Sequence, residues 1–79
     1  MENRKYIDHQ DNLGYTALMY ASINGHVEIA KLLLENGADP TIKNNDGKTA
    51  LILAFENNHI EIVNLIEEFE KEFNPRIIN

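Results

Sequence analysis

The sequence contains two copies of one unit. Residues 12–34 and residues 45–67 align without a gap at a fixed offset of 33, with identical residues at eleven of 23 positions. Several of the remaining pairs exchange one apolar residue for another. A period of this length is typical of proteins whose units are too small to bury their own apolar faces and must stack on one another. The repeat therefore predicts a short stack of similar units.

Each unit reads as a turn followed by two antiparallel helices. Thr16 and Thr49 occupy the N-cap position, where a hydroxyl accepts a hydrogen bond from a free backbone amide, so we expect first helices over 17–24 and 50–57. Glycine, and asparagine as the second choice, tolerates the left-handed conformation that ends a helix. Such residues follow both helices, at Asn24-Gly25 and at Asn57-Asn58.

The second helix of each unit is predicted to start near His26 or His59, with Glu28 or Glu61 in its first turn. Apolar residues recur in both helices, and we expect them to form a broad buried face. In the first unit they are Val27, Ile29, Ala30, Leu32, Leu33 and Leu34. In the second they are Ile60, Ile62, Val63, Leu65 and Ile66, continuing to Phe69 and Phe73 before the predicted stop at Asn74-Pro75.

These residues resemble the ankyrin repeat family, which has the same period and the same order of elements. The family pattern is recovered as Asp11-x-x-Gly14-x-Thr16, Gly25-His26-x-Glu28-Ile29 and Leu33-Leu34-x-x-Gly37-Ala38-Asp39. The resemblance covers residues 6–68 and implies an all-α fold, a short solenoid of helix-turn-helix repeats joined by β-hairpin-like loops. The boundaries that follow are a partial repeat over 1–11, a repeat over 12–44, a repeat over 45–73 with a C-terminal capping helix, and a tail over 74–79.

Three departures from the family pattern affect packing. Met19 and Ile52 replace a histidine that ties neighbouring loops together in the family, so packing must take its place here. Phe55 stands where a small residue is usual, and we expect it to need extra room. The second unit lacks the Gly-Ala-Asp ending and continues over 67–73 as a charged segment, which looks like the polar outer layer that ends a solenoid.

The composition disfavours several classes of partner. A formal net charge of −6 and a sequence pI of about 4.8 leave no basic stripe for nucleic acid, and an anionic membrane is disfavoured for the same reason. The chain has no cysteine, no visible secretory signal and no apolar run as long as a membrane span. We therefore expect an intracellular, cytoplasmic setting, without nucleic acid or membrane as a partner.

The residues offer no chemistry that we would assign to an active site. His26 and His59 occupy the same place in successive units, and the resemblance implies a structural hydrogen bond for each rather than a metal site. The carboxylates of the charged ending are expected to be solvated, and Ser22, the only serine, lies within a helix. No glycine-rich phosphate loop is present. We expect no catalytic residues, no cofactor and no metal ligands.

What remains is recognition of another protein. In the family, partners contact the loop tips and the exposed side of each first helix. Carried over, these positions are Asn12, Leu13, Tyr15, Ile23 and Asn24 in the first unit, and Lys43, Asn45, Asp46, Lys48, Glu56 and Asn57 in the second. Leu13, Tyr15 and Ile23 are apolar or aromatic at positions that the scaffold is expected to leave exposed, which is typical of an interaction patch.

The sequence leaves two other roles open. Because about three units are needed to bury a continuous core, the chain is also interpretable as the end segment of a longer solenoid or an oligomer. Its exposed repeat edge would then serve stacking or self-association, and Leu13 and Ile23 would cover that edge. A further alternative is a regulatory ankyrin segment of an enzyme whose catalytic domain lies elsewhere.

Overall fold

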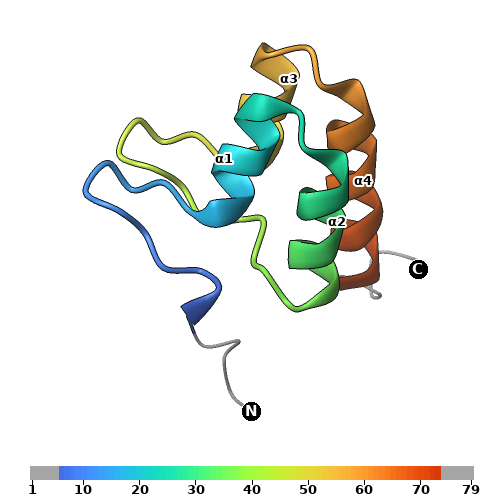
Figure 1. Cartoon of the computed structure of the whole chain (residues 1–79), viewed down its shortest axis with the longest axis horizontal. Helices are drawn as coiled ribbons and strands as arrows, with labels where there is room; N and C mark the ends of the chain where they lie inside the picture. The colour runs from blue at the N-terminus through green and yellow to red at the C-terminus, as the bar shows by residue number, and fades with distance from the viewer. Residues whose placement is uncertain (1–5, 74–79) are drawn as a thin grey trace.

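Four α-helices in two layers make up the part of the chain that the structure describes (Figure 1). A computed structural model describes residues 6–73, with side chains through Lys71. The helices are α1 (Ala17–Asn24), α2 (Val27–Glu35), α3 (Ala50–Glu56) and α4 (Ile60–Phe73). No strand occurs within residues 6–73, so the predicted all-α class is confirmed. The predicted stop at Asn74-Pro75, the tail and residues 1–5 lie outside the described part.

The helices pack by unit and by layer. α1 pairs with α2 and α3 pairs with α4 to give two helical hairpins, and the second hairpin stacks on the first through the α1–α3 and α2–α4 contacts. In Figure 1 the loops before α1 and α3 project together to one side of the helices. None of the helices that the structure describes is both long enough and apolar enough to cross a membrane.

The predicted N-caps are present in both units. The Thr16 hydroxyl accepts from the backbone N–H of Met19 at 3.2 Å, and the Thr49 hydroxyl accepts from that of Ile52 at 3.3 Å. Met19 Sδ also lies 3.4 Å from the backbone nitrogen of Thr16, where it accepts that N–H. The first helix is thus held at its start by a reciprocal pair of contacts, with a thioether in place of the usual carboxylate or amide.

α1 ends at Asn24 as predicted, whereas α3 ends at Glu56, one residue before the predicted end. Gly25 and Asn58 adopt left-handed φ angles of 73° and 64°. Asn58 is the only residue other than glycine with a positive φ among those described. The second helices begin one residue after His26 and His59, with Glu28 and Glu61 in their first turns.

The core lies between the two helical layers. Its fully buried members include Leu18 and Met19 of α1 and Ile62 and Ile66 of α4. The buried side chain of Met19 thus packs in the core at the position where the family has a histidine, as predicted. Its counterpart Ile52 is exposed, so the same prediction is wrong there.

The predicted buried faces are wrong at three positions, because Ile29 and Leu32 of α2 and Ile60 of α4 are exposed. Each lies on a side of its helix that no other described element covers. Phe55 is exposed as well, because no other described element covers its side of α3. The extra room that the sequence predicted for its ring is therefore not needed.

α4 is longer than α2, with 14 residues against nine. Its final turns carry exposed Glu67 and Glu68 together with the half-buried Glu70. Burial raises the pKa of Glu70, and the nearby Glu67 and Asp39 carboxylates raise that pKa further. The exposed side chains in these turns, Glu67, Glu68 and Lys71, are therefore charged, and the capping role of this segment stays a prediction.

Candidate protein-interaction surface

The loops before α1 and α3 are built by the same turn. The carboxylate oxygen Oδ1 of Asp11 accepts from the backbone N–H groups of Leu13 and Tyr15 at 3.0 and 2.9 Å. Asn44, 33 residues later, accepts in the same way from the N–H groups two and four positions ahead, at 2.9 and 3.0 Å. Side-chain acceptors therefore fix both tips, which we call the first and the second hairpin loop, residues 11–15 and 44–48.

The two hairpin loops are also bonded to each other. The backbone N–H of Asn45 donates to the carbonyl oxygen of Leu13 at 3.0 Å, and the Asn45 side-chain amide donates to that of Asn12, also at 3.0 Å. Behind the tips, the amide of Gln10 donates to the Lys43 carbonyl oxygen at 3.0 Å. The tips are therefore one hydrogen-bonded platform, and the side chain of Asn45, a predicted contact residue, is engaged in building it.

The structure corrects the predicted apolar patch. Leu13 is exposed at the tip of the first hairpin loop, as expected. Tyr15 and Ile23 are half-buried and pack against the core, so they are not the exposed residues that the sequence predicted. The polar candidates lie on the surface, with Lys48 half-buried and the others exposed, namely Asn12, Asn24, Lys43, Asn45, Asp46, Glu56 and Asn57.

An aromatic pair explains why Tyr15 is partly covered. Its ring stacks on that of Tyr20, with centroids 5.1 Å apart and planes at 27°. The Tyr20 hydroxyl donates to the Asp11 carboxylate, which ties α1 to the first hairpin loop. This bond, with those from the Tyr15 and Leu13 amides, lowers the pKa of Asp11 below its usual 3.8, and the pKa of Tyr20 is raised above 10.0 chiefly by the same bond. Sequence reasoning missed Tyr20, because its counterpart is an ordinary core leucine.

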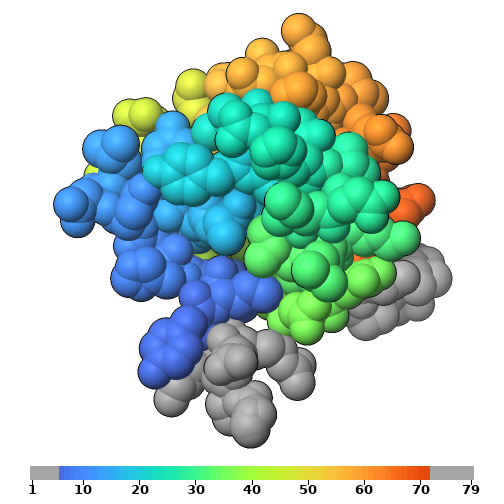
Figure 2. Space-filling model, viewed as in Figure 1, coloured from blue at the N-terminus to red at the C-terminus, as the bar shows by residue number. Residues whose placement is uncertain are grey.

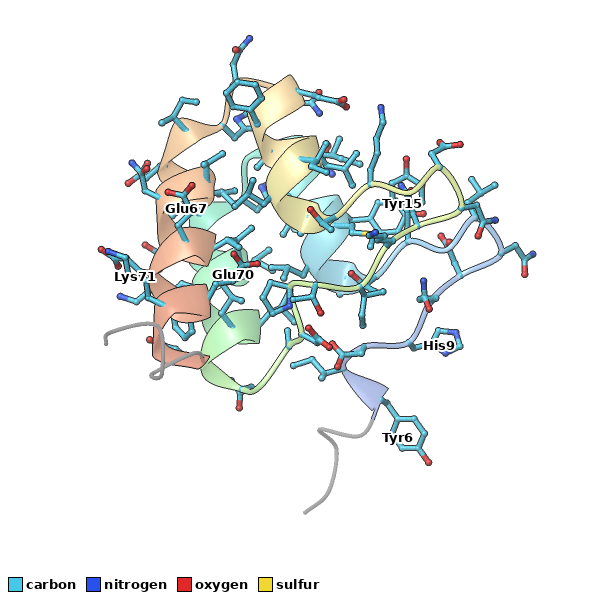
Figure 3. The ribbon with its side chains drawn as sticks, turned by 180° about the vertical axis from the view of Figure 1, so that it is seen from behind. Tyr6, His9, Tyr15, Glu67, Glu70 and Lys71 are labelled. Carbon is cyan, nitrogen blue, oxygen red and sulfur yellow. The ribbon has the colours of Figure 1, made fainter. Side chains whose placement is uncertain are left out.

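On the second unit, Lys48 and Glu56, the counterparts of Tyr15 and Ile23, form an ion pair. The Lys48 ammonium lies 2.9 Å from a Glu56 carboxylate oxygen, and the carboxylate raises the pKa of Lys48. Both side chains are partly exposed, so a polar partner has access to the pair. Figure 3 shows Tyr15 beside the hairpin loops, while Glu67 and Lys71 lie on α4 at the opposite side of the molecule.

The structural role predicted for the histidines holds for His59. Its Nε2 lies 3.1 Å from the carbonyl oxygen of Ile23, so the ring links the second unit to the end of α1. The ring packs so closely on Gly25 that a β-carbon there would lie 2.6 Å from Cε1. His26 is exposed, and within residues 6–73 its ring makes no such hydrogen bond.

Two surface hollows lie away from the hairpin loops. One, of about 360 Å³, runs along α2 and is lined by Ile29, Leu32 and three charged residues. The other, of about 430 Å³, lies between α2 and α4 over an apolar floor of Val27, Leu65 and Phe69. Within the described residues, no three histidine or carboxylate side chains gather in a way that could hold a metal ion.

Comparison with known proteins gives the same family. Residues 1–77 match the family described as "Ankyrin repeats (3 copies)". Over 47 residues, 54% of this chain, the sequence is 50% identical to ankyrin repeat protein L86 of Acanthamoeba polyphaga mimivirus, with 8% of that protein covered. Over 42 residues, 53% of this chain, it is 40% identical to ankyrin repeat family A protein 2 of Homo sapiens, with 13% of that protein covered.

A third relative is the NAD-capped RNA hydrolase NUDT12 of Homo sapiens, 61% identical over 31 residues, which are 39% of this chain and 7% of that protein. The chain thus spans only a small part of the length of these relatives. The family match extends over nearly the whole sequence, and the two stacked helical hairpins have the order of elements that the repeat requires. The chain belongs to the ankyrin repeat family.

Proposed function

We propose that this chain is a non-enzymatic protein-binding module whose partner surface consists of the hairpin-loop tips and the exposed sides of α1 and α3. The observation that supports this most is the hydrogen-bonded platform, from which Leu13 projects with 61% of its surface exposed. A fixed platform loses little conformational entropy when a partner binds, so more of the contact energy becomes affinity.

The chemistry around Leu13 suits a folded protein partner. The hairpin loops and α3 add exposed or partly exposed amide, carboxylate and ammonium groups to this apolar anchor, namely those of Asn12, Asp46 and the Lys48–Glu56 pair. An apolar centre with a polar rim is the usual anatomy of a protein interface. The chain's net charge of −6 favours a partner surface that is neutral or basic. We place this binding inside the cell, in the cytoplasm.

The hydrolase relative does not extend this proposal to catalysis. The match covers 7% of that protein, so its named reaction lends no role to this chain. A regulatory segment beside a catalytic domain would use the same binding surface.

Two leucines make a matched test of the surface. Leu13 and Leu32 are 61% and 60% exposed, the first on the hairpin platform and the second on α2. We expect Leu13→Asp to lower recovery of specific interactors by about tenfold or more, as removal of an interface anchor does, and Leu32→Asp to leave it unchanged. The measurement is quantitative mass spectrometry of proteins co-purified with the tagged full chain, with helicity checked by circular dichroism. Equal recovery with both variants would contradict the proposed surface.

A structural role in stacking is a second candidate, favoured by a different observation. Tyr20, Ile29 and Leu32 are exposed together on the first unit, on the side that faces away from α3 and α4. Apolar residues at these positions are expected where another helical layer covers them. If Leu32→Asp and not Leu13→Asp abolishes recovery of interactors, stacking is the main role.

A further inference from the structure

The second helices of the two units flank a groove that has no part in the hairpin-loop surface. α2 and α4 pack against each other, and the hollow between them has a volume of about 430 Å³. Its floor is apolar and consists of Val27, Leu65 and Phe69, all half-buried. In Figure 2 the side chains of α2, in green, lie on the face toward the viewer, with orange atoms of the second unit along their right-hand margin. We call this surface the α2–α4 groove.

The repeat does not account for the aromatic ring in the floor. Phe69 corresponds to Asn36, the exposed C-cap residue at which α2 has already ended. α4 continues for 14 residues against nine in α2, and these additional turns bring Phe69 into the same groove as Val27. The second unit therefore adds a partly exposed ring where the first unit has an exposed amide.

Carboxylates line both walls of the groove. Glu28 stands on α2, Glu61 and Glu68 stand on α4, and all three are exposed. Among the described lining residues the one ammonium is that of Lys31, and it forms no ion pair with any of these carboxylates. The walls thus carry an excess of negative charge beside apolar surface, and the chain's net charge of −6 adds to this potential.

An apolar floor between negative walls defines the chemistry of a complementary ligand. An anionic membrane surface would be repelled, and a purely apolar ligand would leave the carboxylates unpaired. A peptide segment with apolar residues on one side and Lys or Arg on its flanks satisfies both parts of the groove.

The shape of the groove favours a helical ligand. On α4 the lining extends from Glu61 to Phe69, about 12 Å along the helix axis, which matches two to three turns of a partner helix. Leu65 and Phe69 are four residues apart, so apolar side chains from successive turns of that helix reach them. A third helix laid between two packed helices follows the same rules of side-chain packing that join α2 to α4.

We infer that the α2–α4 groove binds a basic amphipathic helix of a partner protein, with its apolar stripe on the floor and its Lys or Arg side chains at the two carboxylate walls. The groove contains no residue of the hairpin loops, α1 or α3. This second surface therefore goes beyond the proposed function and does not depend on it. A second copy of the chain is a poorer occupant, because both copies carry the same net negative charge.

A model helix tests the inference. The probe is a fluorescein-labelled peptide of about 14 residues, with leucines at i, i+3, i+4 and i+7 and lysines elsewhere. Titration with the full chain, followed by fluorescence polarisation at about 50 mM salt, should give a Kd in the micromolar range. A peptide with glutamate in place of lysine should bind at least about tenfold more weakly. In NMR spectra, the amide shifts caused by the leucine–lysine peptide should concentrate on 27–31 and 61–69.

Two adjacent carboxylates provide a matched control. Glu67 and Glu68 are both exposed on α4, but only Glu68 lines the groove. Glu68→Lys should raise the Kd about fivefold or more, whereas Glu67→Lys, with the same change in net charge, should raise it less than about twofold. Phe69→Asn introduces the residue that the first unit has at this place and should raise the Kd about tenfold. Circular dichroism checks the helicity of each variant.

Several results would overturn the inference. They are the absence of saturable binding up to about 1 mM chain, equal effects of the two charge reversals, equal binding of the two peptides, and amide shifts centred on the hairpin loops. Groove shifts that grow with concentration in the peptide-free chain would make the occupant a second copy and would also overturn it. Leu13→Asp should leave the peptide Kd unchanged, so failure of the hairpin-loop proposal is distinguishable from failure of this one.

Discussion

Gly25→Ala should destabilise the chain through two separate effects. The first is backbone strain, because a residue with a β-carbon at φ 73° costs about 1–2 kcal/mol. The second is a collision, since the new methyl group would lie 2.6 Å from Cε1 and 2.7 Å from Nδ1 of His59. The ring must then move and give up its bond to the Ile23 carbonyl oxygen, at a net cost of about 1 kcal/mol. We expect a total loss of about 2–3 kcal/mol.

Gly47→Ala is the control for the strain alone, since Gly47 has a φ of 78° and no atom within 4 Å of a β-carbon built there. Urea unfolding followed by circular dichroism should show Gly25→Ala to be less stable than Gly47→Ala by about 1 kcal/mol, or about 4–8 °C in Tm. In a His59→Ala background the difference should vanish, because the collision is gone. Equal costs in the parent, or a difference that survives without the ring, would refute the assigned contact between the units.

Three further predictions concern the cap, the core and one carboxylate. Thr16→Ala should cost about 1–2 kcal/mol in urea unfolding, because a buried cap is lost. Ile66 is 0% exposed, so Ile66→Ala should lower the free energy of unfolding by about 2–5 kcal/mol. Ile29→Ala should lower it distinctly less in the same assay, since Ile29 is half exposed. Equal losses would contradict the assigned core. The pKa of Asp11 in the folded chain is lowered below 3.8, foremost by the hydrogen bond from the Tyr20 hydroxyl. The ionised Asp11 therefore stabilises the folded state above pH 3.8, and this stabilisation is lost as the pH falls through the lowered pKa. Asp11→Asn should therefore flatten the fall in Tm measured by circular dichroism at acidic pH, and an unchanged slope would show that this carboxylate is not responsible.

The helices and their ends could be predicted because the signals are local. A threonine hydroxyl reaches an amide three residues ahead, and glycine or asparagine takes the left-handed conformation with no help from the rest of the fold. The offset of 33 also predicted that His26 and His59 would occupy equivalent places. Equivalent residues make equivalent contacts only where a neighbouring unit lies against them. Among the described residues, His59 has such a neighbour in the first unit and His26 has none.

Burial on the outer sides of the two units could not be predicted for the same reason. Helical periodicity indicates which residues share a face, but it does not say whether another unit covers that face. Ile29 and Ile62 are identical residues in identical registers, and only the second is buried.

The predicted apolar patch failed through specific contacts. Tyr15 gains a stacking partner in Tyr20, which the second unit replaces by Leu53, and the hydrogen bond to Asp11 orients that partner. Neither contact is visible in the alignment of the two units, because each involves a position at which they differ. Ile23 lies at the end of α1, where it packs against the core while its carbonyl oxygen serves His59.

The central claim is that the second hairpin loop is held by the first, so that both tips form one binding platform. Amide hydrogen exchange at Asn45 measures this directly, with the Asn12 amide as the internal comparison in the same place one unit earlier. The Asn45 N–H donates to the Leu13 carbonyl oxygen at 3.0 Å, so it should exchange slowly, close to the amides of the core helices, while Asn12 exchanges fast. Fast exchange at both amides would show that the loops move independently and would contradict the platform on which the proposed function rests.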